Sequence, residues 1–236
     1  MRPLLIAALL PLAACQSQWE KNHADPGPKA ARDFAETGFT AVELRGPDDV
    51  VVRQGANFAV RAEGPQKLLD QLDIHVEGQS LKIGRKPGNH SWFGDHDGIR
   101  VTVTLPHLNA ARLAGSGDLS ADRAEGDFHG DLAGSGDLNI AGLAATGTTL
   151  SLAGSGDVKI AGTTGLLKVS LVGSGDIDAT GLAASSADIS ITGSGGVRGK
   201  VSGSATVSIA GSGDVELSGG AKCQTHVAGS GNARCS

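Results

Sequence analysis

One short motif, Gly-Ser-Gly-Asp, recurs along the second half of this 236-residue chain and limits the folds that the chain can adopt. Its seven copies follow one another at intervals of 18 to 20 residues. They begin at Gly115, Gly134, Gly154, Gly173, Gly193, Gly211 and Gly229. A fixed period indicates one structural unit repeated along an axis. Such an array supplies a scaffold, and no residue set in the sequence amounts to a catalytic motif.

Apolar and polar residues alternate on both sides of each motif, which is typical of a strand with one buried face. Four residues after the first glycine lie Leu119, Leu138, Val158, Ile177, Val197 and Val215. Two residues before it lie Leu132, Leu152, Leu171, Ile191, Ile209 and Val227. Each unit is therefore strand, turn, strand, and it is too short to hold a helix as well. Stacked copies predict an all-β fold, a right-handed parallel β-solenoid with coils of about 19 residues.

Stacking would align the turn aspartates in one column, and like charges at that spacing repel. The column consists of Asp118, Asp137, Asp157, Asp176 and Asp214. Either backbone donors or a bound cation must offset the repulsion. We favour turn capping, because calcium-binding β-rolls use a nine-residue repeat and because Gly196 and Asn232 replace Asp in two copies. We therefore expect no cofactor, and a calcium- or metal-binding module is an alternative.

The first 14 residues predict a cleaved export signal, with one positive charge at Arg2 and an apolar run from Leu4 to Leu12. The sequence Leu12-Ala13-Ala14-Cys15 resembles the lipobox of bacterial lipoproteins. That resemblance implies a lipid on Cys15 that holds the protein to a membrane, and Gln16 next to it implies sorting to the outer membrane, facing the periplasm or the cell surface. The alternative is a plain secretory peptide with an incidental cysteine. Residues 15–37, which are polar, form a predicted tether.

The two remaining cysteines, Cys223 and Cys235, would then lie in an oxidising compartment, where pairing is the usual outcome. Both fall in inward columns beside the last turn, so we predict a disulfide that closes the carboxyl-terminal end of the solenoid. Two buried free thiols are the alternative. The net charge of −5, without a basic stripe, argues against a nucleic-acid partner.

Residues 38–108 lack the motif but alternate in the manner of strands, and residues 109–236 hold the repeats. Pro65 to Leu72 is a candidate short helix. The amino-terminal part could form extra coils of the solenoid or a β-rich cap over its open end. The sequence leaves both possibilities open, but some cover is needed, because an exposed strand edge promotes aggregation.

A polar loop from Lys86 to Gly98 holds the densest group of candidate binding residues. They are His90, Trp92, Phe93, Asp95, His96 and Asp97. Two His and two Asp could bind a transition metal, but we favour a solvated hairpin tip, because this spacing on a loop is weak evidence for a metal site. Trp92 and Phe93 could contact a glycan, a protein or a lipid surface, or they could cover the end of the solenoid.

From Gly38 to its end, the chain resembles the putative auto-transporter adhesin head domain, known as the GIN domain. The resemblance rests on Phe39-Thr40-Ala41-Val42, on Asp49 to Gly55, on Leu81-Lys82-Ile83, on Val101 to Pro106 and on the Gly-Ser-Gly-Asp series from Leu113-Ala114 onward. It implies a β-helical extracytoplasmic domain. Adhesion is the family label, and the resemblance brings no catalytic residues.

Together these features predict a non-catalytic, lipid-anchored envelope protein with an adhesin-like binding or structural role and a glycan or protein ligand. A polysaccharide-acting β-helix enzyme is the alternative. Hydrolysis would need paired carboxylates about 5 to 9 Å apart in a groove. The outward columns mix Ser, Asn, Lys, Asp and Arg, and they show no such pair outside the turns.

Overall fold

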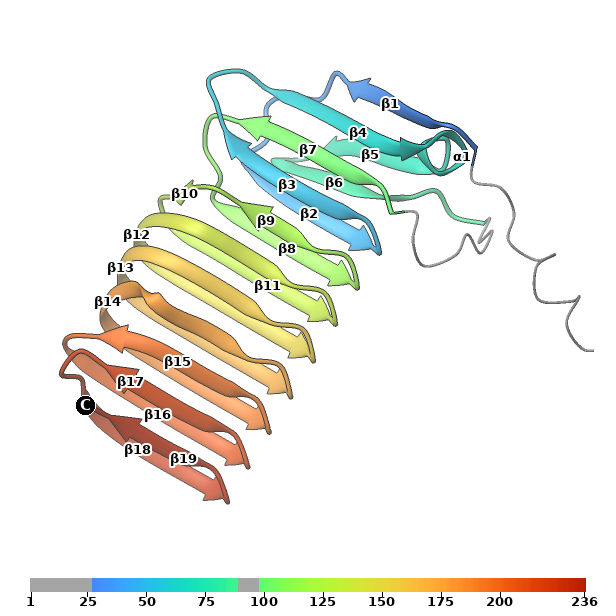
Figure 1. Cartoon of the computed structure of the whole chain (residues 1–236). Helices are drawn as coiled ribbons and strands as arrows, with labels where there is room; N and C mark the ends of the chain where they lie inside the picture. Colours follow the sequence, from blue (N-terminus) through green and yellow to red (C-terminus); the bar gives the residue numbers. More distant parts are fainter. Residues whose placement is uncertain (1–26, 89–97) are drawn as a thin grey trace, which may run out of the picture.

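The computed structural model describes residues 27–88 and 98–236, and almost all of the ordered elements are strands (Figure 1). Two groups of predicted residues lie outside these ranges. They are the lipidation candidate Cys15 and the loop residues His90, Trp92, Phe93, Asp95, His96 and Asp97.

The repeats form the predicted parallel β-solenoid, which has about seven turns. Figure 1 shows the coils stacked as a row from green to red. Their strands are β8 (Ala110–Gly115), β9 (Leu119–Ala121), β10 (Ala124–Glu125), β11 (Phe128–Gly134), β12 (Leu138–Gly154), β13 (Val158–Gly173), β14 (Ile177–Gly193), β15 (Gly196–Val201), β16 (Ser204–Gly211), β17 (Asp214–Ser218), β18 (Lys222–Gly229) and β19 (Asn232–Cys235).

Each motif pairs with the same motif of the next coil, in parallel register. Gly134 pairs with Gly154, which pairs with Gly173, and the same register continues to Gly229. The first glycine of every motif has a φ between 132° and 145°, a conformation that side chains rarely allow. The spacing of the motifs in the sequence is therefore the length of one coil.

Every turn separates two outward faces of the solenoid, which we name by their place in the coil. The leading face is formed by strands that end at a turn: β8, β11, the second halves of β12, β13 and β14, β16 and β18. The trailing face is formed by strands that follow a turn: β9, the first halves of β12, β13 and β14, β15, β17 and β19.

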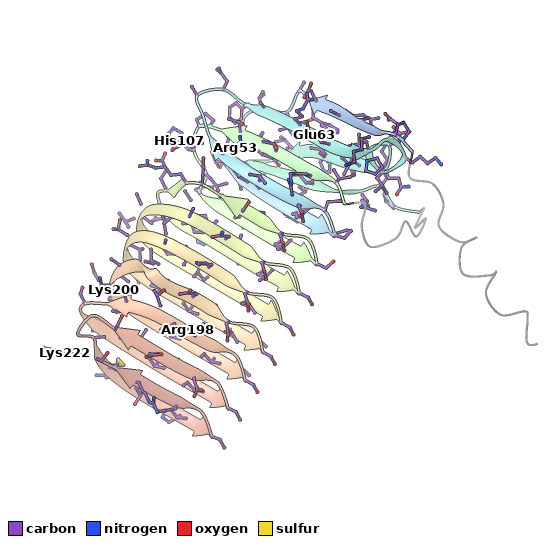
Figure 2. All side chains as sticks on the ribbon, viewed as in Figure 1. Arg53, Glu63, His107, Arg198, Lys200 and Lys222 are labelled. Carbon is purple, nitrogen blue, oxygen red and sulfur yellow. A yellow bond between two sulfur atoms is a disulfide. The ribbon has the colours of Figure 1, made fainter. Side chains whose placement is uncertain are left out.

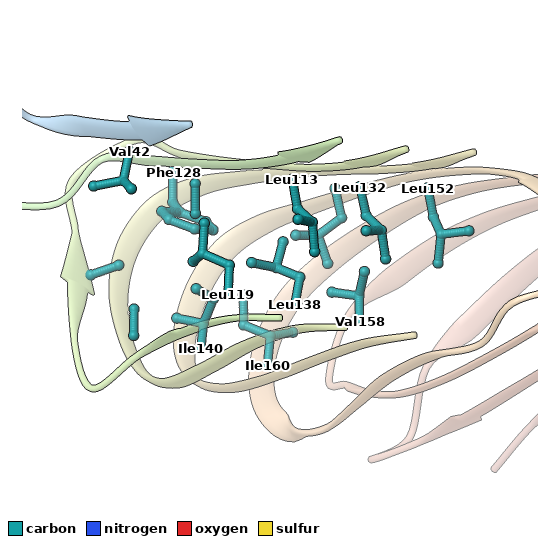
Figure 3. Close-up of a cluster of buried hydrophobic side chains, with 14 of the residues drawn as sticks. Val42, Leu113, Leu119, Phe128, Leu132, Leu138, Ile140, Leu152, Val158 and Ile160 are labelled. Carbon is teal, nitrogen blue, oxygen red and sulfur yellow. The ribbon is translucent and has the colours of Figure 1, made fainter. Parts of the chain in front are cut away.

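The apolar columns of the two faces meet inside the coils (Figure 3). Leu132 and Leu152 approach from the leading side, and Leu138 and Val158 approach from the trailing side. All four side chains are at most 2% exposed. The core is thus a continuous stack of aliphatic side chains, and no coil could bury its share without its neighbours.

The amino-terminal part contributes both extra coils and a cap. Its elements are β1 (Lys29–Phe34), β2 (Ala41–Gly46), β3 (Asp49–Gln54), β4 (Ala59–Pro65), α1 (Gln66–Leu69), β5 (Leu72–Glu77), β6 (Ser80–Arg85) and β7 (Arg100–Leu105). Strands β2 and β3 stack in parallel on β8 and β9, and β6 and β7 stack in parallel on β2 and β3. Strands β5, β4 and β1 then add antiparallel pairings that end the stack. The candidate helix is one turn long, shorter than the predicted segment.

Strand β1 lies inside residues 15–37, the segment that the sequence predicts to be a tether. It pairs with β4 from Lys29↔Pro65 to Phe34↔Val60, and Arg32 forms an ion pair with Asp70 at 2.5 Å. Part of the predicted tether is therefore folded onto the cap. The polar composition of this segment hid the strand, because β1 is an edge strand with only alternate residues half-buried.

The predicted disulfide joins Cys223 of β18 to Cys235 of β19 across the last turn, with 6.4 Å between the Cα atoms. Both residues are partly buried against the end of the core. In Figure 2 the sulfur bond lies beside Lys222. The disulfide therefore holds the one coil of the repeat array that has no following coil to pair with.

We expect reduction, or replacement of both cysteines by Ser, to destabilise the last coil by about 2 to 3 kcal/mol, because a short closed loop is released in the unfolded state. Hydrogen exchange should accelerate in β18 and β19 before it does in β12 and β13. Equal acceleration throughout the solenoid would contradict this local role.

Candidate functional site

A groove runs across the trailing face, next to the turns. Its volume is about 570 Å³, and it spans strands β9, β12, β13, β14 and β15 and continues onto β3 and β7 of the amino-terminal coils. The charged and polar residues that line it are Asp49, Arg100, Asp118, Ser120, Asp137, Asn139, Asp157, Lys159, Asp176, Asp178 and Arg198. The groove therefore presents a turn aspartate and one further polar or charged side chain on each of several successive coils, as a binding surface for a long molecule would.

The turn aspartates form one wall of this groove, and each is tied to the next coil. A carboxylate oxygen of each accepts a hydrogen bond from the backbone N–H at the same position of the following turn. The pairs are Asp49 with Asp118 (3.3 Å), Asp118 with Asp137 (3.0 Å), Asp137 with Asp157 (3.1 Å), Asp157 with Asp176 (2.8 Å), Asp176 with Gly196 (2.7 Å) and Asp214 with Asn232 (3.0 Å). Backbone donors thus offset the repulsion within the column.

The column has one gap, at Gly196. This glycine donates to Asp176 at 2.7 Å but has no side chain with which to accept from Asp214 in the next turn. The ladder of aspartates is therefore interrupted between the fifth and sixth copies, and the groove ends at this level, with Arg198 as its lining residue in β15.

Charges of both signs lie side by side on the floor of the groove. Lys159, Asp178 and Arg198 occupy the same outward position on three successive coils. Figure 2 shows Arg198 on the outer side of β15. Hydrogen bonds from the hydroxyl and backbone N–H of Thr180 lower the pKa of Asp178, and the charges of Arg198 and Lys159 lower it further. Asp178 is therefore a carboxylate at neutral pH.

Among residues 27–88 and 98–236, no group of three or more His, Cys, Asp and Glu side chains is arranged to hold a metal ion. The same residues contain no helix that is long and apolar enough to span a membrane.

Two residues of the groove, Asp49 and Arg100, come from the amino-terminal part, and the sequence analysis missed them as site residues. Asp49 closes the turn Gly46-Pro47-Asp48-Asp49, which pairs with the first Gly-Ser-Gly-Asp turn through Gly46↔Gly115. The signal was present in the flanking columns: Leu44 lies two residues before Gly46, and Val50 lies four after it. Pro47 and Asp48 conceal the motif itself.

The model of one protein family, described as "Putative auto-transporter adhesin, head GIN domain", matches residues 38–221. The chain belongs to this family. The match covers the two amino-terminal coils and most of the repeats, so the GIN domain includes both parts of the solenoid. No curated protein matches the chain.

Solved structures share the fold of this GIN-domain protein at low sequence identity. A putative adhesin from Bacteroides fragilis NCTC 9343 has a TM-score of 0.78 and 20% identity, over 89% of this chain and 97% of that chain. A putative lipid binding protein from Parabacteroides distasonis ATCC 8503 has a TM-score of 0.69 and 22% identity, over 88% and 97%. A putative adhesin from Parabacteroides merdae ATCC 43184 has a TM-score of 0.69 and 19% identity, over 89% and 97%. At this identity the likeness concerns the fold alone.

Proposed function

We propose that this GIN-domain protein is a non-catalytic, adhesin-like protein of the cell envelope, anchored in the outer membrane through Cys15, and that the trailing-face groove binds an extended, hydroxyl-rich polymer such as a polysaccharide. The observation that carries the proposal is the groove itself, which has a row of turn aspartates and a polar or charged side chain beside them on successive coils. A ligand with its own repeat along an axis suits such a surface.

The chemistry of the groove favours a polysaccharide over a nucleic acid or an apolar ligand. Carboxylates such as Asp137 and Asp157 accept hydrogen bonds from hydroxyl groups, and Lys159 and Arg198 donate them. The row of carboxylates at the turns would repel a phosphate backbone. Hydrogen bonds to charged groups are also the stronger ones, so a few of them per coil can hold a flexible polymer.

Hydrolysis needs one carboxyl group that stays protonated near neutral pH to act as the acid. The lowered pKa of Asp178 works against that role. The turn aspartates already accept backbone hydrogen bonds across the coils. These features support binding without cleavage.

The groove is tested by measuring the binding of the full chain to a panel of envelope and capsular polysaccharides. We expect Lys159→Ala and Arg198→Ala each to weaken binding of the retained polysaccharide by about tenfold, as the loss of one charged hydrogen bond predicts. Lys200→Ala is the matched control, because Lys200 lies two residues beyond Arg198 on the same strand, outside the groove (Figure 2). Equal affinities for all four proteins would refute the site.

The anchor is tested separately, by fractionating cells that carry Cys15→Ala. We expect the variant to leave the membrane fraction, because a lipid on Cys15 would be the attachment. Protease treatment of intact cells then distinguishes the cell surface from the periplasm as the side on which the groove acts.

A further inference from the structure

The leading face differs from the groove side in having small side chains in regular columns. The column next to the turns consists of Ala114, Ala133, Ala153, Val172, Thr192, Ala210 and Ala228. The next column toward the amino end of each strand includes Ser151, Ser170, Ser190 and Ser208. Small residues on neighbouring strands make a surface on which another sheet can pack closely.

This face also holds most of the exposed apolar bulk of the described residues. Val172 is 53% exposed and Leu166 is 36% exposed, and both lie on β13, at the middle of the stack of coils. Two shallow hollows flank them, of about 440 Å³ and about 240 Å³. Exposed apolar side chains that lie close together on one face are typical of an interface.

The leading face carries charges of both signs, and their arrangement would let the face pair with an identical face of another copy. Lys168 on β13 and Asp188 on β14 occupy the same column on adjacent coils. Asp127 lies just before β11, two coils before Lys168, and Lys222 lies at the start of β18, two coils after Asp188. Among the described residues, Lys168, Asp188 and Lys222 form no ion pair. Asp127 accepts a hydrogen bond from the hydroxyl of Thr146, but it too has no oppositely charged partner among the described residues.

We propose that a second copy of this chain docks face to face on the leading face, about a two-fold axis that runs parallel to the strands between β13 and β14. Rotation about that axis reverses the order of the coils and keeps each column above itself. It places Lys168 opposite the partner's Asp188, and Asp127 opposite the partner's Lys222. It also places Asp131, which contacts Arg112 within the chain at 3.0 Å, opposite the partner's His226.

Other two-fold arrangements lose this complementarity. An axis centred on β13 would bring Lys168 against its own copy. An axis along the solenoid would place each coil opposite its own copy, so that Lys168 would face a residue of the partner's β13 instead of the partner's Asp188. The arrangement between β13 and β14 instead places Val172 opposite the partner's Thr192, and alanines of the outer coils opposite alanines.

The face is large enough for a specific contact. Six coils about 4.8 Å apart and four outward columns of extended chain cover roughly 750 Å² on each copy, close to the ~800 Å² per partner of a standard interface. The contact would leave the trailing-face groove open on the outer side of both copies.

The test is sedimentation equilibrium of the full chain in density-matched detergent, with micelles in excess over protein. We expect a dimer for the wild-type chain. The dimers of Lys168→Glu and of Asp188→Lys should be weaker and should dissociate at protein concentrations more than tenfold higher than the wild-type dimer does. The double variant Lys168→Glu with Asp188→Lys should dimerise again, because it exchanges the two charges and keeps them opposite each other. Lys159→Glu, on the same strand but on the trailing face, should dimerise as the wild type does.

Restored dimerisation in the double variant also shows that the single variants did not simply unfold. A wild-type chain that is monomeric at all concentrations would overturn the proposal. Dimerisation that is equal in all five proteins would overturn it as well, since the contact would then lie elsewhere.

Discussion

Gly156→Ala should destabilise the solenoid by at least about 3 kcal/mol, because a Cβ at this position has no space. Gly156 is the second glycine of the third motif, and a Cβ built on it lies 2.0 Å from the carbonyl oxygen of Gly136 in the preceding turn. The obstacle is backbone, which cannot rotate away, so relief requires the two turns to separate. Urea unfolding followed by circular dichroism measures the loss.

Gly147→Ala is the matched control. Its Cβ would meet only a side-chain oxygen of Asp127, at 3.4 Å, and its φ lies outside the left-handed region. We expect a change below about 1 kcal/mol, of either sign, because alanine also restricts the unfolded chain. If both variants unfolded at the same urea concentration as the wild type, the second glycine of the motif would not be a packing requirement.

Asp48→Ala should cost about 3 to 5 kcal/mol, the usual result of removing one partner of a buried ion pair. The side chain of Asp48 is fully buried and binds Arg85 through both oxygens, at 2.6 and 3.1 Å. It also accepts a hydrogen bond from the N–H of Ile99 at 3.3 Å. Asp48 thus joins the end of β6 to the start of β7, and the melting temperature should fall steeply without it.

A double-mutant cycle separates the contribution of the Asp48–Arg85 ion pair from the other effects of the two substitutions. Asp48→Ala with Arg85→Ala should cost little more than either change alone, because the second change removes an already unpaired charge. Glu63→Ala is the surface control (Figure 2). The side chain of Glu63 is 59% exposed and that of its partner Arg61 is 50% exposed, so we expect almost no change in the free energy of unfolding. Additive losses in the cycle would mean that the two side chains act independently.

The repeat region was predictable from the sequence because one rule governs every coil. The columns that contain Leu138 and Leu152 are inward, and the motif length equals the coil length, as the register shows. The disulfide followed from the same columns, with Cys223 and Cys235 beside the last turn. These features depend on spacing within one coil, which a sequence displays directly.

The amino-terminal coils and the groove depend instead on contacts between distant segments. Asp48 takes the place of a motif glycine, and its partner Arg85 lies 37 residues away, so nothing nearby in the sequence marks the turn. The groove needs Arg100 beside Asp49, a pairing of β7 with β3 that no repeat encodes. The outward residues Lys159, Asp178 and Arg198 read individually as solvated polar positions, and their common groove appears only once the coils are stacked.

The position of the β2–β3 coil has a consequence for the order of assembly. This coil lies between β6–β7 and β8–β9, both of which come later in the chain, so the solenoid cannot grow coil by coil from its amino end. Each motif copy can add to the copy before it over a short loop, whereas the pairing of Val50 with Leu119 must close a loop of 69 residues. Long-range pairings are the slow ones. The pairing of the amino-terminal coils should therefore limit the folding rate of this chain. Natural gain or loss of a motif copy would then change the length of the protein and leave this slowest step the same.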